Sequence, residues 1–229
     1  MASREQSLGF SRTMSRVKVQ AFVPSWPGEK QHPQELVNVM SPHCPVSVLD
    51  NPEHYFTEQW EEMRSKFFGS IMLWVMADVT LHDFPKMYAE CIRVLSRPDV
   101  GIYAPNVCWT GHIYDMSTLV KIEDGVYDVP MTDVLCYAVR SDVLEKLMHI
   151  RREKHGKMGW GIELLLTVIA KRMGRKNARD YRFLVDHPNS TSYDIGEASE
   201  GMTALIADSG MYDDIHEVLA QRDQKRIKE

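Results

Sequence analysis

Two side chains stand where this sequence could bind a metal ion. Asp78 follows the apolar run 71–77, and His187 follows an alternating segment at 181–186. Hard divalent cations such as Mg²⁺ and Mn²⁺ prefer carboxylate and phosphate oxygens, and imidazole also binds Mn²⁺. Because neighbouring residues on a strand point in opposite directions, only one of Asp186 and His187 should face such a site. Taken alone, Asp78 or His187 is more often an ordinary turn or loop residue. The other motifs must therefore show whether these two residues form a metal site.

The segment 159–163, Gly-Trp-Gly-Ile-Glu, is the richest local cluster of glycine and tryptophan in the chain. Its glycines allow the backbone to approach a ligand closely, and Trp160 offers a flat face for a sugar or a base. Glu163 falls in the first turn of an expected helix, where the helix dipole favours its ionised form. The alternative interpretation is a structural glutamate at a helix start beside a core tryptophan.

Positive charge is concentrated between His149 and Arg182. Ten basic residues there stand against three acidic ones, an excess of +7 in a chain whose formal net charge is -5. The basic residues are Arg151, Arg152, Lys154, Lys157, Lys171, Arg172, Arg175, Lys176, Arg179 and Arg182, and the acidic ones are Glu153, Glu163 and Asp180. Such an excess could attract a diphosphate or a polyanionic acceptor, although solvated helix faces explain most of these residues equally well.

The composition bounds the class of protein. With 229 residues, 44% of them hydrophobic, the chain suits one large domain or a domain with an appendage. No apolar stretch approaches the roughly 20 residues of a membrane-spanning helix, and the polar start lacks the apolar core of a secretory signal. The four cysteines never form C-x-x-C, which favours free thiols in a reducing compartment over a zinc cluster. We therefore expect a cytoplasmic protein.

Strand and helix patterns alternate through the first half of the chain. Strands are predicted at 17–26, 44–51, 70–79 and 100–107, and helices at 33–40, 57–68 and 83–97. This order predicts an α/β fold with a doubly wound, mostly parallel central sheet and flanking helices. Ligands of such sheets bind beyond the carboxyl ends of the strands. Segment 24–26, Asp50 and Asp78 are expected at that edge.

The second half has a different pattern. Asp124-Gly125 predicts a hairpin turn between short strands within 112–140. Helices are predicted at 141–155 and 162–176, a strand at 181–189, and two further helices at 201–209 and 212–226. Residues 1–16 read as a flexible lead.

The order of these features resembles the nucleotide-sugar glycosyltransferases of the GT-A fold, most closely the large inverting family and its relatives. The resemblance covers about residues 17 to 193. It implies that the first two strand ends, a helix arginine or lysine and the Asp-x-Asp segment "MAD" bind the nucleotide sugar. The corresponding residues are Pro24, Ser25, Trp26, Asp50, Arg64 or Lys66, Ala77 and Asp78.

The same resemblance assigns the metal ligands and the acceptor side. Asp78 and His187 would hold Mn²⁺ or Mg²⁺, and "GWGIE" would supply Trp160 and Gly161 to the acceptor and Glu163 as catalytic base. Two positions depart from the family pattern. Met76 replaces the first aspartate of Asp-x-Asp, and Leu164 replaces a carboxylate that many relatives carry after the glutamate. Asp133 is the reserve candidate for the base.

The expected function is metal-dependent transfer of a sugar from a nucleoside-diphosphate sugar, such as a UDP-sugar, to an acceptor hydroxyl. A carboxylate base implies inversion of configuration at the anomeric carbon. Residues 17–110 would form the nucleotide-sugar-binding half, 111–195 the acceptor and catalytic half of the same domain, and 196–229 a helical tail. The acceptor is unassigned among nucleic acid, protein, glycan and small molecule; a modified DNA base of the bacteriophage type is one option. The alternative is a non-catalytic nucleotide-sugar or polyanion binding module. A sugar nucleotidyltransferase is disfavoured because 23–31 lacks a glycine-rich, basic loop.

Overall fold

A central mixed sheet organises the fold. The computed structural model describes residues 17–26, 32–50, 53, 55–108, 112–188 and 194–227, so the predicted lead at 1–16 lies outside the described residues. The nine described strands follow the order β2-β1-β3-β8-β5-β9-β7-β6, with β4 paired to β9 off this path. They are β1 (Val19–Ser25), β2 (Val46–Asp50), β3 (Ile71–Val75), β4 (Thr80–Leu81), β5 (Val100–Val107), β6 (Val120–Glu123), β7 (Val126–Asp128), β8 (Cys136–Arg140) and β9 (Lys176–Asp186).

Strand direction confirms the predicted fold class. Strands β1, β2, β3, β5 and β9 run in one direction, and β8 lies antiparallel between β3 and β5. Every residue of β3 is buried, as expected of a central strand covered on both faces. The antiparallel β8 was not predicted as a central strand. Because it comes from the second half of the chain, both halves contribute to one sheet.

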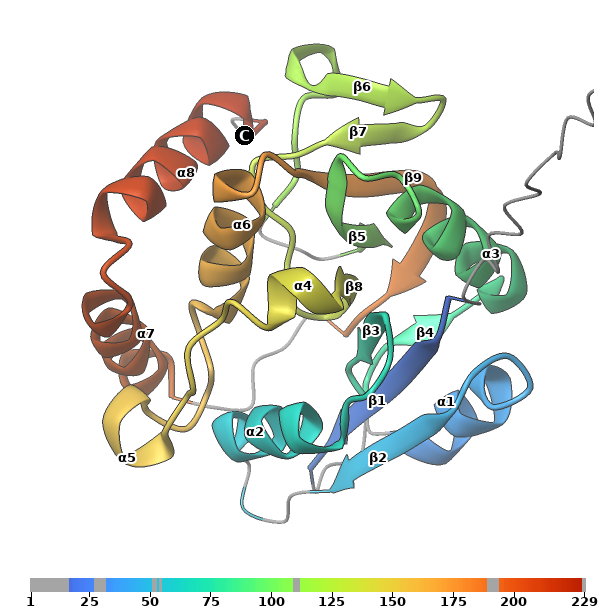
Figure 1. Ribbon diagram of the computed structural model, residues 1–229, viewed down its shortest axis with the longest axis horizontal. Helices are drawn as coiled ribbons and strands as arrows, with labels where there is room; N and C mark the ends of the chain where they lie inside the picture. Colours follow the sequence, from blue (N-terminus) through green and yellow to red (C-terminus); the bar gives the residue numbers. More distant parts are fainter. Residues whose placement is uncertain are drawn as a thin grey trace, which may run out of the picture.

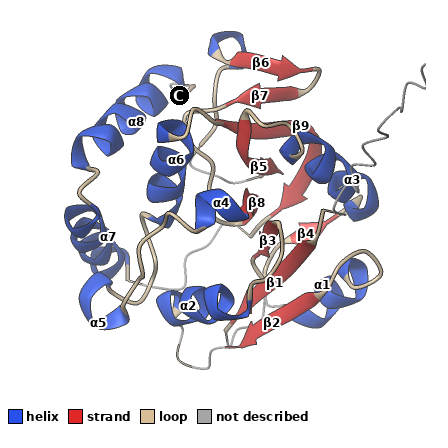
Figure 2. Cartoon of the chain, viewed as in Figure 1, coloured by secondary structure: helices blue, strands red, loops and turns tan. Residues whose placement is uncertain are grey.

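Helices cover the two faces of this sheet (Figures 1 and 2). Helices α1 (Pro33–Met40) and α3 (Phe84–Leu95) lie on one face, and α2 (Phe56–Lys66), α4 (Ser141–Leu144) and α6 (Ile162–Arg172) on the other. Outside them, α7 (Ile195–Ser209) packs on the short α5 (Arg152–His155), and α8 (Tyr212–Lys225) packs on α6. No helix in the described ranges is long and apolar enough to cross a membrane.

The predicted continuous helix at 141–155 is wrong, because the chain leaves the helix after α4 and resumes one turn at α5. Tertiary contacts replace the missing helical hydrogen bonds. The guanidinium of Arg64 donates to the carbonyls of Leu147 (2.9 Å) and Met148 (2.6 Å), and Glu61 accepts from the Ile150 N–H at 2.7 Å. Side chains of α2 thus satisfy a backbone that local propensity would have kept helical.

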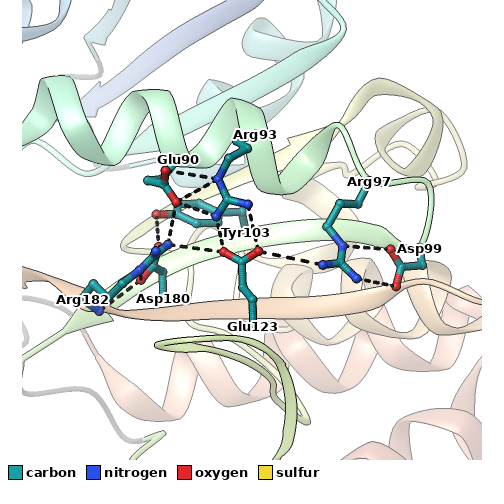
Figure 3. Close-up of polar contacts among 8 residues, drawn as sticks. All are labelled: Glu90, Arg93, Arg97, Asp99, Tyr103, Glu123, Asp180 and Arg182. Carbon is teal, nitrogen blue, oxygen red and sulfur yellow. Dashed lines mark hydrogen bonds and ion pairs between the residues drawn. The ribbon is translucent and has the colours of Figure 1, made fainter.

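A polar network joins α3, the β6–β7 hairpin and β9 (Figure 3). Its centre is Asp180, whose side chain is fully buried and accepts hydrogen bonds from Tyr103 Oη (3.1 Å) and from Arg182 Nε (2.9 Å) and Nη2 (2.7 Å). Arg182 also contacts Glu90 and Glu123. The arginine therefore neutralises a buried charge and attaches the hairpin to α3.

Replacing Arg182 by methionine should leave the Asp180 carboxylate buried without its cation. We expect the free energy of unfolding to fall by about 2 kcal/mol, less than for a fully buried pair because the guanidinium is partly exposed. Chemical denaturation measures the change. Lys86→Met, which removes a solvent-exposed pair with Asp83, is the matched control and should change stability within experimental error. Equal effects of the two substitutions would contradict the central role of Asp180.

Candidate active site

Asp78 and His187 meet because β4 pairs with β9. Thr80 is opposite Asp186 and Leu81 is opposite Val185 in this antiparallel ladder. The chain just before β4 therefore runs beside the chain just after β9. As a result, Asp78 Oδ2 lies 3.5 Å from His187 Nε2, and their side chains are only 11% and 14% exposed. The structure brings the two predicted metal ligands together at the carboxyl edge of the sheet.

The free atoms of this pair suit a cation. Asp78 Oδ1 and His187 Nδ1 are buried, and neither forms a hydrogen bond to another described atom, although buried polar atoms are normally paired. One carboxylate and one imidazole fit Mn²⁺ or Mg²⁺ when phosphate oxygens and water complete the ligand shell. No group of three or more His, Cys, Asp or Glu within the described ranges could hold a metal ion. Tight binding here would therefore need ligands from a bound phosphate compound.

Residues next to His187 fix its orientation. Asp186 Oδ2 lies 2.6 Å from His82 Nε2, whereas the side chain of His187 is the one that contacts Asp78. Behind His187, the Sγ of Cys108 accepts a hydrogen bond from the His187 N–H at 3.1 Å. The sequence indicated only a free thiol for Cys108. Its contact with His187 follows from the pairing of β5 with β9, which places Val107 opposite Val185.

The predicted nucleotide-binding residues of the first three strands also converge. Ser25 is opposite Asp50 at the ends of β1 and β2, and the Ala77 N–H donates to the Pro24 carbonyl at 3.1 Å. Trp26 is half-buried beside them, and Asp50 is exposed. These residues line the same edge as Asp78.

Gln59, which the sequence interpretation did not single out, locks this edge. Its buried side-chain amide donates to the carbonyls of Ser25 and Leu49, both at 2.7 Å, and so ties the end of β1 to the end of β2. A single glutamine on an amphipathic helix carries no sequence signal for such a role.

Arg64 does not reach this edge, which corrects its predicted contact with the nucleotide. It lies in the last turns of α2, and the chain enters β3 only five residues after that helix ends at Lys66. The last turn of α2 must therefore lie near the amino ends of the parallel strands, opposite Asp78. Lys66, the alternative, is near the start of β1, because Gln20 donates to the Lys66 carbonyl at 3.2 Å.

The loop containing Trp160 is held by close backbone packing. Gly159 has φ +68°, and a Cβ atom there would lie 2.2 Å from Cδ1 of Phe56. Gly161 has φ +95° and begins α6. Phe56 in turn stacks on buried Trp60, with ring centroids 6.3 Å apart. Both glycines are therefore required by the backbone, whether or not a ligand approaches them.

Glu163 is a half-buried residue at the start of α6. Its Oε2 accepts a hydrogen bond from the Gly161 N–H at 3.2 Å. Burial raises the pKa of Glu163 to about 7, against the lowering effect of hydrogen bonds from the backbone of Glu163 and Gly161, and the Asp133 charge raises it slightly further. A carboxyl group that titrates near neutral pH suits general acid–base chemistry. The adjacent Leu164 is 3% exposed and belongs to the core.

Asp133, the reserve base, is fixed by protein partners. Its Oδ2 accepts from Arg179 Nη2 at 3.0 Å, and its Oδ1 accepts from the Leu135 N–H at 3.2 Å. Arg179 is 1% exposed, so this is a buried ion pair. Asp133 is better explained as a structural partner of Arg179 than as a base.

The predicted excess of positive charge does not form an unpaired basic surface in the described part of the chain. Nine of the ten basic residues contact a carboxylate or an amide oxygen from elsewhere in the fold. The pairs are Arg152–Glu58, Lys154–Asp208, Lys157–Glu197, Lys171–Gln221, Arg172–Asp214, Arg175–Asp142, Lys176–Asp99, Arg179–Asp133 and Arg182–Glu90. The sequence analysis missed these pairings because each partner is distant in sequence.

The packing of Gly159 can be tested against a glycine of the same conformation. Gly174 has φ +69° with nothing within 4 Å of its would-be Cβ, so Gly174→Ala measures backbone strain alone, about 1 kcal/mol. Gly159→Ala adds the clash with Phe56, and we expect it to cost about 2 kcal/mol more. Denaturant unfolding compares the two variants. Equal costs would show that the loop does not rest on Phe56.

The raised pKa of Glu163 makes stability depend on pH. The folded protein binds this proton more tightly than the unfolded chain, so the wild-type protein should lose stability as pH rises from about 4.5 to about 7 and should lose no more above it. Glu163→Gln does not titrate, and its stability relative to wild type should grow across this window by up to about 3 kcal/mol. Denaturation at pH values spanning the window measures the difference. A constant difference would contradict the shift.

Several solved structures that are similar to this chain are glycosyltransferases. Glucosyl-3-phosphoglycerate synthase from Mycobacterium tuberculosis, in complex with Mn²⁺, UDP-glucose and phosphoglyceric acid, aligns over 85% of this chain and 80% of its own, with 13% identity and a TM-score of 0.60. The same enzyme with Mg²⁺ and UDP aligns over 85% and 79%, with 14% identity and a TM-score of 0.59. GalNAc-T7 with UDP, GalNAc and Mn²⁺ aligns over 87% of this chain and 50% of its own, with 9% identity and a TM-score of 0.61.

Sequence comparison adds no closer relative. No protein-family model matches the chain, and no curated protein sequence matches it significantly. At these identities the structural likeness establishes the fold. The chain therefore has the GT-A fold of nucleotide-sugar glycosyltransferases, as its ordered motifs predicted.

Proposed function

We propose that this protein transfers a sugar from a nucleoside-diphosphate sugar to an acceptor hydroxyl with the help of Mn²⁺ or Mg²⁺. The pairing of Asp78 with His187 carries the proposal, since both have unused buried donor atoms at the ligand-binding edge of the sheet. The similar structures were solved with UDP or UDP-glucose and one of these cations. A UDP-sugar is accordingly the first donor to test.

The donor would lie across the ends of β1, β2 and β3. Trp26 offers an aromatic surface and Asp50 a carboxylate to the nucleoside, next to segment 24–25. Asp78 and His187 would hold the cation, which when bound supplies charge neutralisation for the departing diphosphate. The buried Gln59 bridge keeps the two strand ends in register, so the nucleoside surface is formed before the donor binds.

Glu163 is the proposed base on the acceptor side. It lies at the start of α6, where the Gly161 N–H holds its carboxyl beside the Trp160 loop and burial raises its pKa to about 7. Removal of a proton from the acceptor hydroxyl by such a group typically contributes about 10²–10⁴-fold to the rate. Direct attack by that hydroxyl on the anomeric carbon would invert its configuration.

The charge pattern of the segment 149–182 bears on the class of acceptor. Nine of the ten basic residues at 149–182 already contact acidic or amide groups of the protein, so the electrostatic argument for a modified DNA base loses its support. We favour an uncharged hydroxyl acceptor, such as a glycan or a small molecule, at the Trp160 loop.

A second candidate is a binding module without catalysis. Met76 and Leu164 favour it, because both replace family carboxylates and both lie in the hydrophobic core, 7% and 3% exposed. Glu163 argues against a binding module, because this residue retains a carboxyl with a near-neutral pKa beside the Trp160 loop. The buried residue is its neighbour Leu164.

The metal ligands can be tested by substitution. Asp78→Asn and His187→Gln should each weaken Mn²⁺ binding in the presence of UDP by more than about 10-fold, the loss that even an outer-sphere partner can cause. Electron paramagnetic resonance of free Mn²⁺ measures binding without turnover. Asp186→Asn is the matched control, because this neighbour contacts His82 instead, and it should bind Mn²⁺ as wild type does.

Catalysis is assessed with the same proteins. Wild type incubated with a panel of UDP-sugars and hydroxyl acceptors should give glycosylated products by mass spectrometry, and Glu163→Gln should bind UDP and Mn²⁺ but lose transfer. Donor binding without turnover of any donor by wild type would favour the binding module. Metal-dependent UDP binding that survives Asp78→Asn would remove the basis of the proposal.

A further inference from the structure

Four buried polar side chains share the core layer beneath Glu163. They are Trp60, Trp74, Tyr137 and Thr167, each at most 2% exposed. Their atoms Trp60 Nε1, Trp74 Nε1, Tyr137 Oη and Thr167 Oγ1 form no hydrogen bond to any protein atom in the described ranges. Because a buried donor without a partner is costly, four in one layer call for an explanation.

Topology places these groups on one side of the sheet, in the layer covered by α2 and α6. Trp74 on β3 is directly opposite Tyr137 on β8, so both side chains lie on the same face of the sheet. Trp60 of α2 covers Trp74, with ring centroids 5.1 Å apart. Thr167 lies one turn after Glu163 on α6, and residues four apart share a helix face. The Glu163 carboxylate acts on Tyr137, since its charge adds to burial in raising the Tyr137 pKa.

Internal water is the ordinary partner of such groups. A buried water molecule typically forms about three hydrogen bonds to polar atoms that lack other partners. Two hydroxyls, two indole N–H groups and a nearby carboxyl provide both donors and acceptors for it. The hydroxyls can also turn, so each can donate to the water or to the carboxyl oxygen.

We propose that internal water held by the Tyr137 and Thr167 hydroxyls hydrogen-bonds the Glu163 carboxyl from the core side, which makes Tyr137 a positioning residue for the candidate base. The internal water and its hydrogen bonds do not depend on the proposed function. Only the role of Glu163 as a catalytic base rests on that function. Hydrogen bonds to a carboxylate favour its ionised form. Tyr137 would thereby set the pH at which Glu163 can accept a proton.

The groups that act on Glu163 come from three elements. Tyr137 approaches from β8 and Asp133 from the segment before it, while Glu163 and Gly161 supply backbone N–H groups at the start of α6. Asp133 is paired with Arg179. A change confined to the Tyr137 hydroxyl therefore leaves the other groups in place.

Tyr137→Phe isolates that hydroxyl. Titration of the Glu163 side chain by carboxyl-carbon NMR should show its pKa raised by about one unit relative to wild type, the size expected for one lost hydrogen bond to a charged group. Thr167→Val should shift it in the same direction. Tyr103→Phe is the matched control, because the Tyr103 hydroxyl donates to Asp180 in a different network, and it should leave the Glu163 titration unchanged.

A second measurement needs no variant. In wild-type protein, the indole N–H protons of Trp60 and Trp74 should show nuclear Overhauser contacts to long-lived internal water. Absence of these contacts, or a Glu163 pKa unchanged in Tyr137→Phe, would overturn the proposal. Neither measurement uses a sugar donor or an acceptor, so a failed transfer assay would leave this result standing and would count only against the proposed function.

Discussion

The pairing of a two-residue strand with the end of β9 brings the two candidate metal ligands of this protein together. Asp78 and His187 are more than one hundred positions apart in the chain, and only the register Thr80 to Asp186 puts them side by side. Since strand residues alternate between faces, a shift of one position would turn Asp186 inward and His187 outward. Cys108 adds a second restraint by binding the His187 backbone from β5.

The loop at 159–161 depends on a different constraint, which is steric. Gly159 fits against Phe56 only because it lacks a side chain, and that contact continues through Trp60 and Trp74 to the sheet. Glu163 follows this loop at the start of α6, and its burial is the main cause of its raised pKa. The packed loop and the candidate base are therefore adjacent in the chain at this end of the molecule.

The sequence predicted what local patterns encode. Periodicity placed β1, α1, β3 and β5 within a few residues, and strand ends identified Asp78 and the segment 24–26. Local patterns could not predict the features that depend on contacts between residues distant in the sequence. The motif that suggests a nucleotide contact for Arg64 carries no information on which end of the helix faces the site. The predicted helix at 141–155 is interrupted because side chains of α2 form hydrogen bonds with its backbone. The antiparallel β8 and the two-residue β4 also lack a local signal, because pairing with neighbours defines them.

The long-range ion pairs of the segment 149–182 have a consequence for how fragments of this protein would behave. Three of its cations, Lys154, Lys157 and Arg172, are neutralised by α7 and α8, through Asp208, Glu197 and Asp214. A shortened chain without those helices would expose positive charge that the intact protein conceals. Such a fragment would bind nucleic acids and other polyanions, and this binding would weaken as the salt concentration rises. Its affinity would reflect the missing helices and would not represent a property of the intact protein.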